Sequence, residues 1–427
     1  MKSPWLFADE LPADLFGELR QRVIFECCKW DPQVEDICTL LARPLVLSQD
    51  AWTELARSAE QLALETLAAE AELLADISLQ ASLKLPGNLR KAFDLAARKG
   101  PSAEAARVMR FDFHFTTDGW RISEVNSDVP GGFNEASGFS RLMLPHFPGC
   151  TLPGDPAGAL ADGIVAATDP GSTVALVHAT AFTDDRQVMV YLARELESRG
   201  RQAVLTGPDH LRWRNGMAFV ASDWHTGPVS LVFRFFPAEW LPNLPSVCDW
   251  LHFFTGAVTP LSNPATALLS QTKRFPLVWD KLKSPVSTWR RLLPETRDPR
   301  ETPWQTDETW VLKPACGRVG EGIGIRGVTS EKEWQAIAKN VRRRPDDWVA
   351  QRRFQMTPLI CGVDALFPCI GVFTVNGRAV GAYGRVARTP IVDHLAQDAA
   401  VLVKDSAQRM ETPGSSFLFT HESIGAF

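Results

Sequence analysis

The first quarter of the chain spaces its apolar residues with the period of an α-helix. Residues 48–79 form the clearest such segment, and Ser48 is suited to cap its N-terminus. A second helix is predicted over 88–98. The apolar stripe of the first helix is marked by Leu55, Leu62, Leu67 and Leu74. Because no chemically reactive pattern accompanies the stripe, residues 1–105 are predicted to be a helical N-terminal region that serves packing.

Residues 110–126 change to the two-residue period of a β-strand and are predicted to form a hairpin. One face of the first strand carries Phe111, Phe113 and Phe115. The other face carries Arg110, Asp112 and His114. A solvent-exposed face would explain the polar set. We favour the hypothesis that it is a metal and phosphate site, since cations and carboxylates are gathered on a single patch.

The length of the hairpin loop decides which residues of the polar face meet. A three-residue loop over 117–119, with Gly119 at positive φ, is one favoured geometry. The facing pairs would then be Arg110 with Asn126, Asp112 with Glu124, and Thr116 with Trp120. A two-residue Asp-Gly loop would place Asp112 opposite Val125, and the sequence does not choose between the two. Directly opposed carboxylates repel each other, so the first register would indicate a bound divalent cation.

Segment 127–136 continues from the hairpin and is predicted to be a loop by its composition. Because it leaves directly from Asn126, it is expected to line the same cavity. Asp128 and Glu135 are candidates for binding a cationic or hydroxylated substrate. A role in forming turns and caps is an equally good interpretation of both residues.

Between 172 and 260, strand and helix patterns alternate. Strands are predicted over 172–177, 203–205, 217–220 and 229–236, and an amphipathic helix over 185–199. This order is typical of a parallel sheet within a layered α/β domain. No G-x-G-x-x-G follows the first strand, so the dinucleotide-binding fingerprint is absent.

From 261 onward the chain turns to short strands and glycine-rich turns. Residues 310–313 are predicted to be a strand that runs into a loop carrying Gly317, Arg318 and Gly320. Glycines let backbone N–H groups approach a phosphate closely, and Lys313 and Arg318 would offset its charge. Nucleotide binding is one interpretation, and ordinary hairpin turns are the other, because the P-loop pattern is absent.

Two further strand segments follow the glycine-rich loop. A short strand over 348–351 ends at Gln351. A hairpin is predicted over 369–385, with its turn at Asn376-Gly377 and with Arg385 at its end.

Composition places these patterns in a soluble globular protein of 427 residues, with 45% hydrophobic and 22% charged residues. The length predicts two or three domains, which we place at 1–105, 106–260 and 261–427. A net charge of -5 without a basic block argues against nucleic-acid binding, and no apolar run is long enough to span a membrane. Eight cysteines without a C-x-x-C pair are typical of reduced thiols in a cytoplasmic protein. The oligomeric state is open.

Six short motifs, in the same order, resemble the glutathionylspermidine synthase family of ATP-grasp carboxylate–amine ligases. They are Arg110-Phe-Asp112-Phe, Glu124-Val-Asn126-Ser-Asp128-Val-Pro130, Phe233-Arg-Phe-Phe-Pro237-Ala-Glu239-Trp240, Ser270-Gln-Thr-Lys273, Lys313-Pro-Ala-Cys-Gly317-Arg318-Val-Gly320, and Gly381 to Arg385. Arg234 and Thr272 stand where the family has lysine and asparagine, and the segment after Arg385 matches only loosely. The substrates of the family are therefore not carried over.

The resemblance implies a role for each matched position. The Mg²⁺ ligands would be Asp112, Glu124 and Asn126. The residues that hold ATP would be Lys273, Lys313, Gly317, Arg318, Gly320 and Gln351, the glycines forming a mobile lid and Gln351 lying near the adenine. Arg110 would hold the reacting carboxyl group, and Arg385 would hold the γ-phosphate.

The resemblance also implies the fold and the activity. The fold would be ATP-grasp-like, a mixed α/β architecture with a pre-ATP-grasp domain. The activity would use ATP and Mg²⁺ to convert a small-molecule carboxylate into an acyl phosphate, release ADP, and join the acyl group to an amine. Only the synthetase part is expected, since the first 100 residues read as helical rather than as the amidase domain of bifunctional members. An ATP-dependent phosphotransferase and a non-catalytic nucleotide-binding protein are the alternatives.

Overall fold

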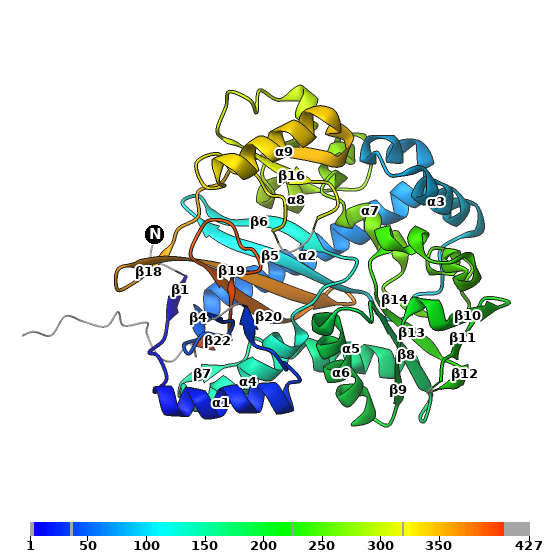
Figure 1. Ribbon diagram of the computed structural model, residues 1–427, viewed down its shortest axis with the longest axis horizontal. Coiled ribbons are helices and arrows are strands. Elements are labelled where there is room, and N and C mark those ends of the chain that lie inside the picture. The colour runs from blue at the N-terminus through cyan, green and yellow to red at the C-terminus, as the bar shows by residue number, and fades with distance from the viewer. Residues whose placement is uncertain (1–3, 35–36, 224, 318–319, 405–427) are drawn as a thin grey trace, which may run out of the picture.

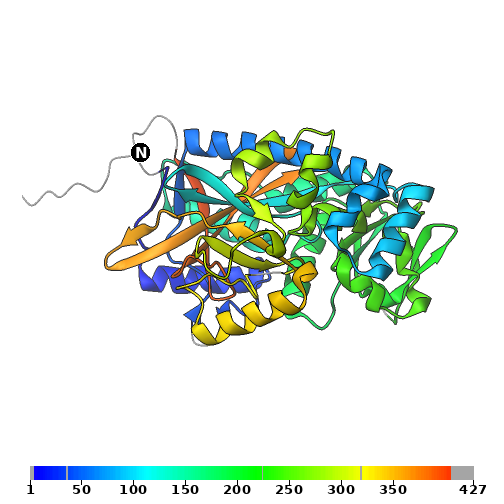
Figure 2. The same ribbon diagram turned by 90° about the horizontal axis from the view of Figure 1, so that it is seen from above.

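A central antiparallel sheet of six strands organises the protein (Figures 1 and 2). The computed structural model describes residues 4–34, 37–223, 225–317 and 320–404. The strand order is β21 (Gln397–Ala399), β20 (Arg378–Ala387), β19 (Asp364–Val375), β5 (Val108–Thr116) and β6 (Gly119–Asn126), with β18 (Leu359–Cys361) paired to β19. The long helix α2 (Gln49–Ala75) lies across one face of these strands (Figure 2).

The predicted hairpin forms, but its register has a different cause from the one expected. Asp112 does lie opposite Glu124, and Gly119 has φ +91°. The loop, however, holds only two residues, because Thr116 already pairs with Gly119. The register shifts between Asp112 and Phe113, where Ser123 is one extra residue in β6. The three-residue loop was therefore wrong, and a β-bulge brings the two carboxylates face to face.

The predicted parallel sheet is confirmed in the middle of the chain. Its strands, in order, are β14 (Leu261–Ser262), β13 (Leu231–Phe235), β8 (Thr173–His178) and β9 (Gln202–Thr206). Helices α5 (Pro156–Ala166) and α6 (Thr183–Glu197) pack beside it (Figure 1). The strand predicted over 217–220 is β11 (Met217–Ala221), which instead joins a separate antiparallel sheet with β10 (Leu211–Arg214) and β12 (Thr226–Pro228).

A small antiparallel sheet lies above the central one in Figure 1. It consists of β15 (Thr296–Arg297), β17 (Trp348–Arg352) and β16 (Trp310–Pro314), and helix α9 (Glu331–Arg343) packs against it. The predicted strands over 310–313 and 348–351 are thus confirmed. The core between helix and sheet contains Trp304, Trp310, Leu312, Trp334, Ile337, Val341 and Trp348. Because this core is separate from the two larger ones, the small sheet is a unit held over the central sheet.

The N-terminal region is helical as predicted, with α1 (Ala13–Glu26), α2 and α3 (Gly87–Lys99). The Ser48 hydroxyl accepts a hydrogen bond from the backbone N–H of Ala51 at 3.1 Å and caps α2. The region also contributes strands that its sequence did not predict. β1 (Trp5–Phe7) and β4 (Leu45–Ser48) form a sheet with β22 (Val401–Lys404) and β7 (Cys150–Thr151). Segments from both ends of the described chain therefore pack together.

The remaining elements are short. They include β2 (Gln33–Val34), β3 (Ile37–Cys38), the π-helical turn η2 (Asn134–Phe139), α4 (Ser140–Met143), α7 (Leu268–Gln271), α8 (Ser287–Leu292) and several 3₁₀ turns. The boundaries placed at 105 and 260 stay a prediction, although the hairpin pairs directly with β19 from the third predicted region. Throughout the described ranges, every helix is too short or too polar to cross a bilayer.

Candidate active site

Both faces of β5 are buried, including the polar face, since all nine residues of the strand are buried. Asp112 is at its centre and is only 1% exposed. The guanidinium group of Arg110 donates to both carboxylate oxygens of Asp112, at 2.7 and 3.0 Å. Arg385 on β20 and the side-chain amide of Asn126 on β6 each donate to Oδ2 of Asp112, both at 3.2 Å. The interpretation of this face as a solvated surface is thereby excluded.

Two lysines approach the second carboxylate from outside the central sheet. Lys273, two residues beyond α7, places its ammonium group 3.0 Å from Oε2 of Glu124. The same ammonium group donates to the backbone carbonyl of Gly317 at 2.9 Å. Lys313, on β16, donates to the backbone carbonyl of Ser123 at 3.2 Å. Residues from four separate parts of the sequence thus meet at one buried patch, as the motifs predicted.

The charges at this patch are set by burial and by ion pairing. Burial alone would raise the pKa of Asp112, but the guanidinium of Arg110 outweighs it and holds this pKa below its usual range. Burial would likewise raise the pKa of Glu124, yet the Lys273 ammonium lowers it. Both carboxylates are therefore ionised at neutral pH. Lys313 differs from the two carboxylates, because burial is the main influence on its pKa and lowers it to about 8.

Three oxygen-bearing side chains at the patch suit a Mg²⁺ ion. Asp112 and Glu124 face each other across the bulge, and Asn126 adds an amide oxygen. No cluster of three or more histidine, cysteine, aspartate or glutamate ligands occurs among the residues that the structure describes. Mg²⁺ in nucleotide sites is held by one or two carboxylates together with phosphate oxygens and water, so a sparse oxygen set fits it better than it fits zinc.

Gly371 on β19 makes room for this patch and was not among the predicted site residues. It pairs with Asp112, and a Cβ atom there would lie 2.7 Å from Cδ of Arg110 and 2.9 Å from Oδ1 of Asp112. An isolated glycine inside a strand pattern is a known signal of close approach, and it could have identified Gly371 from the sequence.

Replacing Gly371 with alanine is expected to displace the Arg110–Asp112 pair and to lower ATP turnover by about tenfold or more. Turnover is measured as ADP release under saturating ATP, with the melting temperature recorded in parallel. Gly17→Ala, in helix α1, is the matched control, because a Cβ there meets no atom within 4 Å. Equal activity of the Gly371→Ala protein and the wild type would show that the close approach is unimportant.

A cavity opens between the central sheet and the small sheet. Its apolar walls are provided by Val311, Ile323, Ile325, Phe354 and Met356. Lys313, Gln351 and Arg385 also line it, and Gln351 donates to the Thr296 hydroxyl at 2.9 Å. An apolar slot that leads to cationic groups has the polarity that a base with an attached triphosphate requires, and its volume of about 80 Å³ must expand before a nucleotide fits. Gln351 thus lines this cavity, while its position near the adenine stays a prediction.

The glycine-rich loop closes one side of this cavity. Gly320 lines it and has φ +71°, and a Cβ there would approach the carbonyl oxygen of Val392 to 2.7 Å. Gly317 accepts the hydrogen bond from Lys273 described above. Arg318, also predicted to hold the nucleotide, lies outside the described residues.

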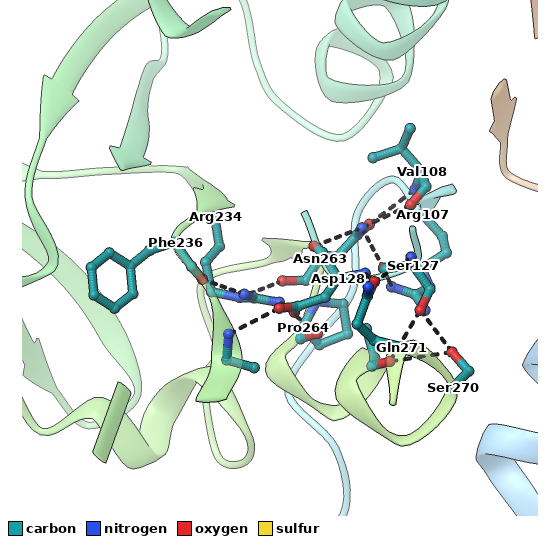
Figure 3. Close-up of polar contacts among 12 residues, drawn as sticks. Arg107, Val108, Ser127, Asp128, Arg234, Phe236, Asn263, Pro264, Ser270 and Gln271 are labelled. Atoms are coloured by element: carbon teal, nitrogen blue, oxygen red, sulfur yellow. Dashed lines mark hydrogen bonds and ion pairs between the residues drawn. The ribbon is translucent and has the colours of Figure 1, made fainter. Parts of the chain in front are cut away.

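Asp128 lies two residues beyond β6, and its side chain is bound by other groups of the protein (Figure 3). Its carboxylate forms an ion pair with Arg234 on β13 and accepts the backbone N–H of Ala238 at 2.9 Å. Both residues of the pair are at most 1% exposed. Nearby, the Gln271 side-chain oxygen accepts the backbone N–H groups of Ser127 and Asp128 at 2.8 and 3.0 Å. This network fixes the end of β6 relative to the segment that carries Lys273.

Glu135, the other predicted substrate-binding residue, lines a cavity of about 310 Å³ on the opposite side of the patch. Arg110, Glu124, Asn126 and Arg385 face the same cavity. Glu135 forms an ion pair with Lys29, which the sequence did not single out. No motif contains Lys29, and only the folded chain brings it here. The substrate roles of Asp128 and Glu135 stay predictions.

Two solved structures match the chain in a comparison of structures. A glutathione synthetase-like effector from Globodera pallida, in its apo form, superposes with a TM-score of 0.62 at 13% identity and covers 92% of this chain and 98% of its own. A protein assigned as a γ-glutamylcysteine synthetase from Methylobacillus flagellatus KT has a TM-score of 0.43 at 12% identity, covering 76% and 87%. Among curated proteins, none matches in sequence. The first likeness is one of fold alone.

A family model extends over most of the sequence. The model described as glutathionylspermidine synthase preATP-grasp matches residues 43–404. This range contains all six motifs, and it confirms both the resemblance and the predicted ATP-grasp-like mixed α/β fold. We conclude that the chain belongs to the glutathionylspermidine synthase preATP-grasp family.

Proposed function

We propose that this protein is an ATP-dependent, ADP-forming ligase that activates a carboxylate as an acyl phosphate and joins it to an amine. The observation that carries the proposal is the convergence of four cationic side chains with two opposed carboxylates on one buried patch. The cations are Arg110, Lys273, Lys313 and Arg385. A packing role alone does not account for so many buried charges, since each costs free energy to remove from water.

The cations at the patch suit the first chemical step. A substrate carboxylate must approach the γ-phosphate of ATP, so two anionic groups are brought together. Fixed guanidinium and ammonium groups in a water-poor site lower this electrostatic barrier. Arg110 opens onto the 310 Å³ cavity and is placed to hold the carboxylate, whereas Lys313 lines the apolar cavity and is placed to hold phosphate. Arg385 borders both cavities and lies between them.

Asp112, Glu124 and Asn126 are the residues that would hold Mg²⁺. When bound, the ion would neutralise phosphate oxygens and orient the triphosphate. Asp112 is paired with two arginines and Glu124 with Lys273. These pairs keep the oxygen donors ionised and in place.

The second step requires an amine to attack the acyl carbon and to expel phosphate. Water would compete for the acyl phosphate, so the site must exclude it. The glycine-rich loop borders the nucleotide cavity and is in a position to do so. The open side of the reacting patch is the 310 Å³ cavity, which we assign to the carboxylate and amine substrates.

The test is incubation of the full chain with ATP, Mg²⁺ and mixtures of acids and amines, followed by mass spectrometry. The expected result is ADP release that depends on both an acid and an amine, together with a product that has lost one water relative to the two substrates. A product that has gained only a phosphate group would instead indicate a phosphotransferase. Calorimetry without any ATP binding would contradict both activities.

The affinity for ATP is expected to fall as pH rises above about 8. Burial lowers the pKa of Lys313 to about 8, so its ammonium group loses its proton in the free protein above this pH. Bound phosphate favours the charged form, and ATP binding must then take up a proton. The dissociation constant is therefore expected to rise by about tenfold for each pH unit above this point.

Lys313→Arg is the control for this pH dependence, because a guanidinium group keeps its charge over the same range. Calorimetric titrations with ATP at several pH values give the dissociation constants. A wild-type constant that stays flat between about pH 8 and 10 would contradict the assignment of Lys313 to the phosphates.

A further inference from the structure

Lys29 reaches the substrate cavity from a segment that no motif includes. It follows α1, and its ammonium group forms an ion pair with Glu135 and lies 2.7 Å from Oδ2 of Asp398. On the other side, the hydroxyl of Tyr383 donates to Oδ1 of Asp398 at 2.5 Å. Lys29, Glu135, Asp398 and Tyr383 form one cluster, which we call the acidic wall.

The acidic wall is continuous with the reacting patch. Lys29, Glu135 and Tyr383 line the same 310 Å³ cavity as Arg110 and Arg385. The guanidinium carbons of these two arginines lie 5.3 and 5.8 Å from the centre of the Tyr383 ring. Arg110 and the acidic wall therefore border one continuous cavity.

Glu135 has one carboxylate oxygen that can accept a hydrogen bond from a ligand. The residue is 8% exposed, and its Oε2 atom is buried without a hydrogen-bond partner among the residues that the structure describes. Glu135 lies in the π-helical turn η2, and such turns occur frequently at functional sites. A buried carboxylate oxygen without a donor is costly, so this atom indicates a position for a donor that the chain does not supply.

Lys29 remains charged in this environment. Burial alone would lower its pKa, but the carboxylates of Asp398 and Glu135 raise the pKa well above its usual value. The acidic wall thus consists of two carboxyl groups and one permanent ammonium group. A site with two carboxyl groups has this composition when one ammonium group is already bound to it.

We propose that Lys29 is a specificity-determining residue that fills an ammonium site in the acidic wall, leaving Oε2 of Glu135 to accept a single donor from the amine substrate. In this form the cavity binds an amine through one cationic group, and a second cationic group on the amine adds no affinity. The inference rests on the proposed function only in naming the amine substrate as the occupant. The ion pairs and the unpartnered oxygen are independent of that function.

The test measures binding of two probes that differ by one ammonium group, without ATP. Calorimetry is carried out with n-butylamine and with α,ω-diaminobutane on the wild type and on Lys29→Met, which keeps a side chain of similar length. The wild type is expected to bind the two probes with affinities within about threefold of each other. Lys29→Met is expected to bind the diamine about tenfold more tightly than the monoamine, because it removes the ammonium group that pairs with the carboxyl groups of Glu135 and Asp398.

Two further variants make the result specific. Lys99→Met, at the exposed end of α3, removes a lysine elsewhere and is expected to leave both affinities unchanged. Adding Glu135→Gln to Lys29→Met is expected to abolish the gain for the diamine. Lys29→Gln serves as the second charge-removing variant if the methionine variant does not fold, as judged by circular dichroism.

Absence of a diamine preference in a folded Lys29 variant would overturn the proposal and leave the cluster as a structural ion pair that ties α1 to the sheet. A preference that survives the Glu135→Gln change would overturn it as well. Because no ATP is present, these outcomes are distinct from a failure of the proposed ligase activity.

Discussion

Replacing Asp112 with asparagine is expected to lower ATP turnover by about 10² to 10³. The carboxylate of Asp112 lies at the centre of the patch, where Arg110, Arg385 and Asn126 all donate to it. An amide keeps the shape but removes the charge that orients both guanidinium groups. It also removes one of the two carboxylates that would hold Mg²⁺.

The measurement is ADP release with the acid and amine pair found by mass spectrometry, at saturating ATP and over a range of Mg²⁺ concentrations. Asp118→Asn is the matched control, because Asp118 is exposed at the turn of the same hairpin. This control is expected to retain wild-type turnover. If Asp112→Asn also turned over normally, with an unchanged requirement for Mg²⁺, the assignment of the metal ligands would be wrong.

Replacing Asp128 with asparagine is expected to lower the free energy of unfolding by about 3–5 kcal/mol. Asp128 and Arg234 form an ion pair in which both side chains are at most 1% exposed. Arg234 also donates to backbone carbonyls, at 3.0 Å to that of Asn263 and 3.0 Å to that of Pro264, so it cannot turn away to reach water (Figure 3). Asparagine would leave its guanidinium charge buried without a counter-ion.

Denaturant-induced unfolding followed by tryptophan fluorescence measures this loss. Asp162→Asn is the control, because the Asp162 side chain is 70% exposed where it pairs with Arg199. Exposed ion pairs contribute about 0–1 kcal/mol, so the control is expected to change stability little. Similar losses in the two variants would mean that the buried pair is not the anchor that holds the end of β6.

The hairpin separates what local pattern predicts from what it does not. Its alternation correctly placed Arg110 and Asp112 on one face, because side chains two apart in a strand always share a face. The three-residue loop was wrong, because the loop holds two residues. A separate bulge at Ser123 shifts the register by one residue within β6. The free-energy cost of a bulge is small, and its position depends on how both strands pack. The alternating pattern therefore does not predict it.

The sequence predicted the Asn376-Gly377 turn better than it predicted the partners of charged side chains. The Asn376-Gly377 turn forms as expected, with φ of +50° and +79°, because that dipeptide favours this geometry by itself. For Asp128 the local sequence left a ligand-binding role and a turn or capping role equally open, and it did not predict the ion pair with Arg234, 106 residues away. Nothing in the local sequence distinguishes a carboxylate that faces a ligand from one that faces a buried arginine.

The sequence by itself determined the N-terminal helices, the two faces of the hairpin and the strands of the parallel sheet. These features depend on period, capping and turn chemistry, which act over a few neighbouring residues. Only the tertiary structure decided that Gly371 must lack a side chain beside Asp112, and that Lys29 lines the 310 Å³ cavity. Both depend on segments far apart in the chain packing together, and the free energy of such contacts belongs to the whole fold rather than to any local pattern.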